Sequence, residues 1–161
     1  HAADNNKIYC MNLAAPFLID VDFFYGRMTA MIPFCDYIFC NESEAACFGK
    51  KNGWGDDLKE VATKLAAWEK TNSKRPRCVV FTQGSESTLI AFEGKVTEYA
   101  VTPLAKDKLV DTNGAGDAFV GGFLSQLVQG LPTAKCVEAG HYAAREVIQR
   151  SGCTFPAEPS F

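Results

Sequence analysis

The sequence predicts an α/β fold, in which helices cover both faces of a mostly parallel sheet. Short apolar runs alternate with longer segments of helical periodicity, which is the order that strand–helix units produce. Residues 78–81 are apolar at every position, as expected for a strand buried on both faces of a parallel sheet. Two β-rich runs, 88–92 and 96–101, flank a glycine-containing connection at 93–95, which predicts a β-hairpin.

The remaining elements follow from apolar spacing and turn residues. Pro33 ends a predicted helix over residues 17–32, and Gly130 ends the helix that follows the hairpin. Residues 72–77 are polar and basic and predict an exposed connector. The predicted strands cover residues 8–13 and 37–40. The predicted helices cover residues 17–32, 58–71 and 133–150, with a further helix that begins at residue 41 and another that ends at residue 129. Residues 49–55 and 151–161 are predicted to be irregular.

The composition is that of one ordinary soluble domain. The 161 residues are 47% hydrophobic and 22% charged, with a net charge of -3. No basic run suits nucleic acid, and no apolar run approaches the roughly 20 residues of a membrane helix. The seven cysteines are odd in number and form no Cys-x-x-Cys pair, so we expect reduced thiols in a cytoplasmic protein. With His1 and His141 as the only histidines, a zinc site of the usual spacing is unsupported.

Residues 111–124 contain the strongest candidate for chemistry. Gly114, Ala115 and Gly116 lead into Asp117, and apolar residues at helical spacing follow. Such a turn presents free backbone N–H groups and the positive end of the helix dipole, which together suit a phosphate. The alternative is that Asp117 only complements the dipole and the glycines only form a tight connection. The spacing alone favours neither interpretation.

Two further polar groups follow predicted strands. Asn41 and Glu44 come directly after residues 37–40, and Thr82 and Gly84 come after 78–81. Ligands in α/β sheets bind outside the carboxyl ends of the strands, so we expect these residues and the Gly114 turn at one edge. The alternative for the first pair is a helix cap at Asn41 with an acid in the first turn.

The run Asp-Thr-Asn-Gly-Ala-Gly-Asp at 111–117, followed by Ala-Phe-Val-Gly-Gly-Phe, resembles the C-terminal signature of the ribokinase-like (PfkB) family of sugar and nucleoside kinases. Residues 121–128, 139–144 and 152–156 are most similar to its adenosine-phosphorylating members. The resemblance covers residues 1–161 but only the C-terminal half of the family's chain. It implies a ribokinase-like fragment whose lid and first strands lie in a missing N-terminal half, which would be its partner.

The resemblance also implies roles for individual residues. Asp117 would be the general base, and Gly114, Ala115 and Gly116 the anion hole. Glu44 would act on Mg2+, largely through water. The other implied ATP- or phosphate-binding residues are Asn41, Thr82, Gly84, Asn113 and His141, and residues 150–153 near Asp111 resemble a site for a monovalent cation such as K+.

The implied reaction is transfer of the γ-phosphate of ATP to the 5'-hydroxyl of adenosine, which gives AMP and serves purine salvage. The implied compartment is the cytoplasm, with the nucleus as a second one. A sugar kinase of the same family is the enzymatic alternative, because the Asn-x-x-Glu and Gly-Ala-Gly-Asp motifs are shared across its substrates. A non-catalytic nucleotide-binding module that lacks the nucleoside pocket is the third interpretation.

Overall fold

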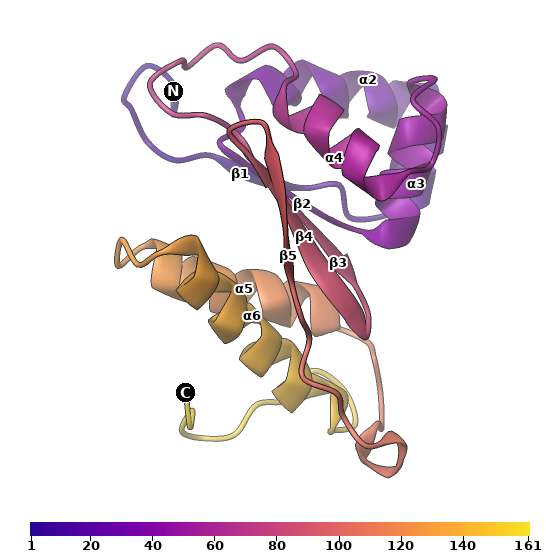
Figure 1. Cartoon of the computed structure of the whole chain (residues 1–161), viewed down its shortest axis with the longest axis vertical. Helices are drawn as coiled ribbons and strands as arrows, with labels where there is room; N and C mark the ends of the chain where they lie inside the picture. Colours follow the sequence, from indigo (N-terminus) through magenta and orange to yellow (C-terminus); the bar gives the residue numbers. More distant parts are fainter. The chain divides into compact units, whose positions relative to one another are not determined.

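The computed structural model describes residues 1–161 and contains two compact units, His1–Glu98 and Tyr99–Phe161 (Figure 1). The first unit holds a five-stranded sheet and four helices, and the second holds a pair of helices. In order, the elements are β1 (Cys10–Asn12), α1 (Pro16–Asp20), α2 (Asp22–Met31), the short 3-10 helix η1 (Ile32–Phe34), β2 (Tyr37–Asn41), α3 (Glu42–Lys51), α4 (Leu58–Ala66), β3 (Cys78–Gln83), β4 (Glu86–Phe92), β5 (Lys95–Tyr99), η2 (Lys106–Lys108), α5 (Ala115–Leu127) and α6 (Thr133–Ile148).

The sheet confirms the predicted α/β class. Its strands lie in the order β1-β2-β3-β4-β5, in which β1, β2 and β3 are parallel and β4 runs antiparallel to β3. The four apolar residues of β3 are all buried, as the uninterrupted run at 78–81 predicted. A two-residue turn joins β4 to β5, and both of its residues have positive φ, 49° at Glu93 and 75° at Gly94. That conformation is the one a tight hairpin requires, so the predicted hairpin is confirmed.

The main core of the first unit lies between the sheet and its helices. Ile38 and Cys40 of β2 and Val79 and Phe81 of β3 alternate onto the helix-covered face. Phe48 of α3 packs against them, together with Val61 and Leu65 of α4. The helix predicted to begin at residue 58 therefore buries Val61 and Leu65 in the core.

The predicted helix over residues 17–32 is instead two helices. Val21 between them is extended, with φ -79° and ψ 114°. Lys51, at the end of α3, donates to the Asp20 carbonyl at 2.9 Å and to the Asp22 carboxylate at 2.6 Å. A side chain thirty-one residues away in sequence thus bonds a carbonyl that a continuous helix would have used.

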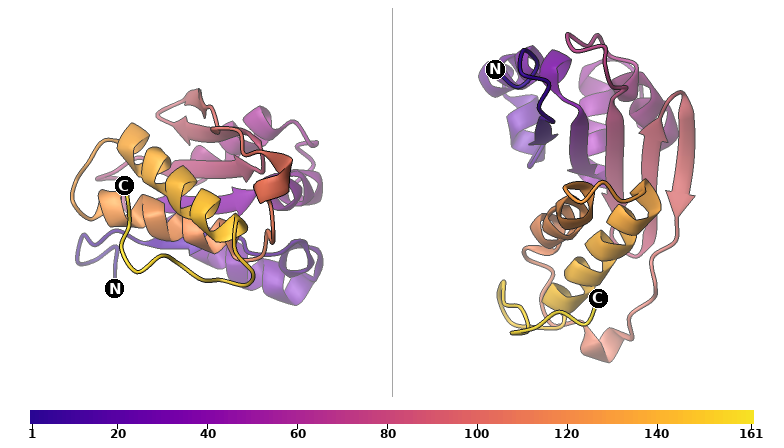
Figure 2. Two further views of the ribbon diagram at one scale, coloured as in Figure 1. Left: turned by 90° about the horizontal axis from the view of Figure 1, so that it is seen from below. Right: turned by 90° about the vertical axis from the view of Figure 1, so that its left-hand side faces the viewer.

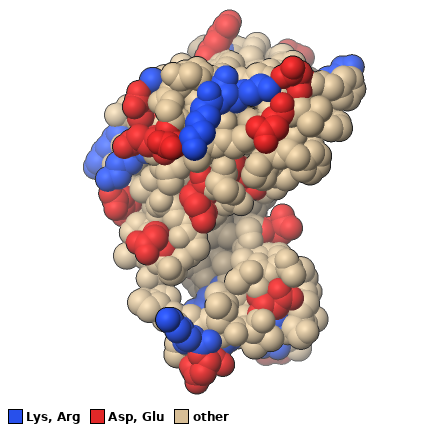
Figure 3. All heavy atoms as spheres, turned by 90° about the vertical axis from the view of Figure 1, so that its right-hand side faces the viewer, with Lys and Arg blue, Asp and Glu red and all other residues tan.

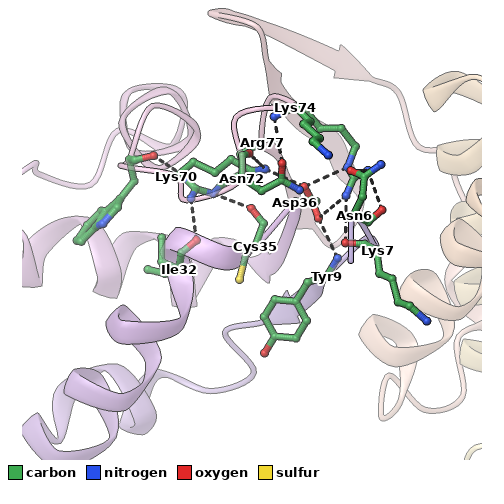
Figure 4. Close-up of polar contacts among 12 residues, drawn as sticks. Asn6, Lys7, Tyr9, Ile32, Cys35, Asp36, Lys70, Asn72, Lys74 and Arg77 are labelled. Carbon is green, nitrogen blue, oxygen red and sulfur yellow. Dashed lines mark hydrogen bonds and ion pairs between the residues drawn. The ribbon is translucent and has the colours of Figure 1, made fainter. Parts of the chain in front are cut away.

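The predicted exposed connector at 72–77 is correct only in part, because residues 73, 74 and 76 are exposed whereas Asn72 is buried and Arg77 is only 2% exposed. The last carbonyls of a helix have no intrahelical partner, and a guanidinium offers five N–H donors in a fixed fork. The hydrogen bonds from Arg77 to the carbonyls of Leu65, Trp68 and Glu69 explain why α4 ends at Ala66 and does not reach residue 71. Figure 4 shows Arg77 with Ile32 and Cys35, to whose carbonyls it donates at 2.7 and 3.2 Å. Arg77 also donates to the carbonyls of Leu65 (3.2 Å), Trp68 (2.6 Å) and Glu69 (3.0 Å).

Asp36, which is 1% exposed, is the second buried charge of this region (Figure 4). Lys70 donates to its carboxylate at 2.8 Å, Arg75 at 3.3 Å and the Tyr9 N–H at 2.9 Å. Burial on its own would raise the pKa of Asp36, but these hydrogen bonds and cations outweigh it and hold the pKa below its usual value. The carboxylate therefore stays ionised and ties β1 to the chain before β3.

The second unit is built around the contact between α5 and α6, which lie side by side in both views of Figure 2. Gly122 faces α6 so closely that a Cβ there would collide with the Ala139 carbonyl oxygen. Gly140 in turn faces Phe119, where a Cβ would lie 2.8 Å from the ring. The two glycines therefore set the distance between the helices.

Gly122→Ala should lower the free energy of unfolding by about 1–3 kcal/mol, because an overpacked contact forces the helices apart. Gly121→Ala is the matched control, since a Cβ at Gly121 has no atom within 4 Å. That control should be neutral or stabilising by up to ~1 kcal/mol, as Ala favours helix more than Gly does. Urea titration of both variants measures the difference, and equal stabilities would contradict the close contact.

Charged side chains of both signs are interspersed on the molecular face shown in Figure 3, and no large patch of one sign is visible there. This distribution agrees with the small net charge of -3. None of the helices has the length and apolar character needed to cross a bilayer. The seven cysteines form no disulfide, and Cys35, Cys40, Cys78 and Cys136 are buried.

Candidate active site

The junction of β2 and α3 holds Asn41 and Glu44 in a reciprocal hydrogen-bonded cap. The Glu44 N–H donates to Asn41 Oδ1 at 2.9 Å, and the Asn41 N–H donates to Glu44 Oε2 at 3.0 Å. Asn41 Nδ2 also donates to Glu44 Oε1 at 2.9 Å. The capping interpretation of this pair is therefore realised in the structure, as a capping box. Capping does not exclude a further role, because each carboxylate oxygen can accept more than one bond.

Glu44 is only 5% exposed, although it ends in a carboxylate. Burial raises the pKa of this carboxyl, while the hydrogen bond from the Asn41 N–H acts in the opposite direction. No cation contacts it, so the negative charge is held at this position without a counterion from the protein. A buried carboxylate without a cation is a fitting environment for a hydrated divalent ion.

Thr82 lies beside Asn41 at the carboxyl edge of the sheet. The two residues are register partners in the parallel pairing of β2 with β3. Gly84 follows in the turn between β3 and β4, with φ 57°, a conformation that favours glycine. The structure thus brings together Asn41, Glu44, Thr82 and Gly84 at one edge of the first unit, as predicted. That the Gly114 turn joins them stays a prediction.

The Gly114 turn leads into α5. Gly114 is left-handed with φ 77°, and α5 begins at Ala115. The Ala115 N–H donates to Thr112 at 3.2 Å and the Ala118 N–H to Gly114 at 2.9 Å, whereas the N–H groups of Gly116 and Asp117 have no acceptor in the protein. Gly116 is exposed, and a Cβ there would meet nothing within 4 Å, so the approach to these donors is open. The exposed Asp117 carboxylate lies in the same helical turn.

This turn fits an anion on its own geometry. Two unpaired N–H groups at the start of a thirteen-residue helix add to the positive end of the helix dipole. A carboxylate in the same turn is poised to accept a proton from a group that reacts with that anion. The combination can therefore bind a phosphate and supply a base beside it.

His141 lies on α6, half-buried, with its ring 5.6 Å from that of Phe119 on α5. Burial lowers the pKa of His141, which favours the neutral imidazole at physiological pH. A neutral ring beside an aromatic one suits stacking against a flat ligand as well as a structural role. Asn113 is exposed in the turn before α5, and its N–H donates to the Asp111 carboxylate at 2.9 Å.

The structure adds two sets of hydrogen bonds that were not predicted from the sequence, although the resemblance did place residues 150–153 near Asp111. The Ser43 hydroxyl donates to Asn41 Oδ1 at 2.7 Å and so fixes the orientation of that amide. The Asp111 carboxylate bonds both the Asn113 N–H and, at 3.3 Å, the Gly152 N–H. An aspartate two residues before a turn asparagine is a recognisable Asx-turn pattern, whereas the bond to Gly152 has no local signal.

No group of three or more His, Cys, Asp or Glu side chains comes together to hold a metal ion.

The pfkB family carbohydrate kinase profile matches residues 1–160, nearly the entire chain. The chain belongs to the pfkB family of carbohydrate kinases.

Relatives of this pfkB chain include the protein named adenosine kinase from Dictyostelium discoideum, which is 52% identical over 157 residues, 98% of the chain. Among solved structures, an Anopheles gambiae adenosine kinase in complex with P1,P4-di(adenosine-5) tetraphosphate aligns with a TM-score of 0.93 at 46% identity and covers 99% of the chain. A Schistosoma mansoni adenosine kinase in complex with 2-fluoroadenosine aligns with a TM-score of 0.92 at 33% identity and covers 98% of it.

The pfkB chain spans about half the length of the curated relatives that it matches. It covers 46% of the Dictyostelium protein and 47% of the Anopheles structure. These similarities confirm the ribokinase-like fold and the resemblance to adenosine kinases that the motifs at 111–117 and 152–156 indicated.

Proposed function

We propose that this chain is the C-terminal half of a kinase that transfers the γ-phosphate of ATP to the 5'-hydroxyl of adenosine. The observation that carries the proposal is the start of α5, where the N–H groups of Gly116 and Asp117 lack acceptors beside the Asp117 carboxylate. Relatives named adenosine kinase, at up to 52% identity, support adenosine as the acceptor. The products would be ADP and AMP, the latter entering purine salvage.

In this proposal the Gly114, Ala115 and Gly116 backbone binds the oxygens of the transferred phosphoryl group. Phosphoryl transfer depends mainly on positioning and charge stabilisation, so fixed N–H donors act where the negative charge lies. The Asp117 carboxylate takes the proton from the attacking hydroxyl. Asn113 and His141 contribute to the nucleotide side, with His141 against the adenine of ATP.

At the sheet edge, Asn41, Thr82 and Gly84 would face the phosphates, and Glu44 would hold Mg2+ through water. Mg2+ keeps several waters and needs few carboxylates, which agrees with one buried acid and no larger ligand cluster. When bound, the ion would neutralise phosphate charge.

Residues 150–153 near Asp111 are the proposed region for a monovalent cation such as K+. The other half of the kinase would supply most of the adenosine pocket, and the compartment would be the cytoplasm, with the nucleus as a second one.

A sugar kinase is the second candidate, because the matching family profile is that of carbohydrate kinases. A coupled ADP assay of the full-length native protein, with its intact mass measured, separates the two by comparing adenosine with ribose as acceptor. Turnover with adenosine and a mass about twice that of this 17.6 kDa chain support the proposal. Turnover with ribose alone favours the sugar kinase, and ATP binding without turnover on either acceptor refutes both.

Glu44→Gln in the full-length enzyme should raise the Mg2+ concentration needed for half-maximal activity by about tenfold, because the neutral amide no longer attracts the hydrated ion. Glutamine keeps one oxygen for the Asn41 N–H but cannot accept a second bond from Asn41 Nδ2 at its amide nitrogen, and the Glu44 N–H bond to Asn41 Oδ1 is kept. Glu42→Gln, at an exposed acid in the same helical turn, is the control. An unchanged Mg2+ dependence in Glu44→Gln would leave capping as the only role of this residue.

A further inference from the structure

The chain that follows α6 runs along the segment leading into the Gly114 turn. The N–H groups of Val110 and Asp111 both donate to the Ile148 carbonyl, at 2.9 and 3.2 Å. Farther along, the Gly152 N–H donates to the Asp111 carboxylate at 3.3 Å. Hydrogen bonds therefore join Ile148 and Gly152 to residues 110–111, which lie shortly before the Gly114 turn.

Cys153 completes this contact at the turn itself. Its thiol donates to the Asn113 carbonyl at 3.7 Å. A Cβ placed on Gly114 would collide with Cys153 Sγ and lie 3.9 Å from Val147 Cγ1. Cys153 and Val147 thus pack on the side of Gly114 where any other residue would carry its side chain. Gly114 can adopt φ 77° because it has no side chain, and Cys153 packs against it in that conformation.

The consequence concerns the two free donors of α5. The first N–H groups of a helix have no intrahelical acceptor, and those of Gly116 and Asp117 have none in this chain. The left-handed Gly114 sets the direction from which the preceding chain approaches these donors. If Gly114 relaxed to other conformations, which glycine reaches readily, the turn would spend part of its time in arrangements that do not present both donors. Packing by Cys153 opposes that relaxation.

We propose that Cys153 is a positioning residue, which holds the Gly114 turn in the conformation that presents the N–H groups of Gly116 and Asp117 to a phosphate. The proposal deepens the proposed kinase function and rests on it. In this proposal Cys153 acts through its contacts with the Asn113 carbonyl and the Gly114 backbone. Its effect should therefore appear in the binding of the phosphate donor.

The test uses steady-state kinetics of the full-length kinase. Cys153→Ala should raise the KM for ATP by about tenfold, as expected if the competent turn falls to roughly a tenth of the population. The KM for adenosine should stay unchanged. Cys153→Ser keeps a hydrogen-bond donor of similar size and should restore a near-normal KM for ATP. Glu158→Ala, at an exposed acid of the same tail, is the control and should leave every constant unchanged.

An unchanged KM for ATP in Cys153→Ala would overturn the proposal, and so would an equal loss in Cys153→Ser. A second readout needs no activity: amide hydrogen exchange of residues 111–118 in the full-length protein should become faster in Cys153→Ala and not in Glu158→Ala. Unchanged exchange there, or faster exchange throughout the chain, would also overturn the positioning role. An inactive wild-type kinase would refute the proposed function, while the exchange comparison would still judge the role of Cys153.

Discussion

Asp117→Asn in the full-length kinase should lower kcat by about 100- to 10,000-fold, the contribution typical of a positioned general base. Asparagine has the same size and shape as aspartate but cannot take a proton from the attacking hydroxyl. The Gly116 and Asp117 N–H groups belong to the backbone and are kept, so the KM for ATP should change by only a few-fold. Steady-state kinetics with ATP and adenosine measure both constants.

The alternative role of Asp117, interaction with the α5 dipole, makes a different prediction. Losing a first-turn carboxylate costs about 0.3–1 kcal/mol of stability and has no reason to abolish turnover. Asp107→Asn, at an exposed acid of η2, is the matched control for charge removal in the same unit. A kcat within a few-fold of the wild-type value in Asp117→Asn would reject the base and favour the dipole.

Arg77→Met should lower the free energy of unfolding by about 3–5 kcal/mol, the range found when one partner of a buried charged network is removed. Methionine fills much of the space but donates no hydrogen bond. Five carbonyls, those of Ile32, Cys35, Leu65, Trp68 and Glu69, would lose a buried donor at once. Burial lowers the pKa of Arg77, yet a guanidinium stays protonated at neutral pH, so the full set of donors operates there.

Arg77→Lys should recover only part of this loss, because an ammonium has three donors and lacks the planar fork. Arg27→Met on α2 is the control, since Arg27 is exposed and its change should stay within about 0.5 kcal/mol. Urea titration of this chain followed by circular dichroism compares the three variants. A loss below about 1 kcal/mol in Arg77→Met would mean that water replaces the guanidinium at these carbonyls.

The Asn41–Glu44 cap and the Glu93–Gly94 hairpin show what local pattern predicts well. In both cases the residues that decide the conformation lie within four positions of one another, so their spacing along the chain carries the information. The helix start at the Gly114 turn was predictable for the same reason. Its glycines and the acid that follows are adjacent in sequence and form a helix start by themselves.

Other features depend on partners that are remote in sequence, and the amino-acid pattern could not predict them. The break at Val21 depends on Lys51, and the end of α4 depends on Arg77, because each long side chain satisfies carbonyls in another part of the chain. Nothing near Gly114 in sequence indicates that Cys153 packs against it. Local sequence pattern thus determined the cap, the hairpin and the helix start at Ala115. The folded chain decided which distant cations bond the carbonyls at the helix ends and which side chain packs against the turn, because those partners are remote in sequence.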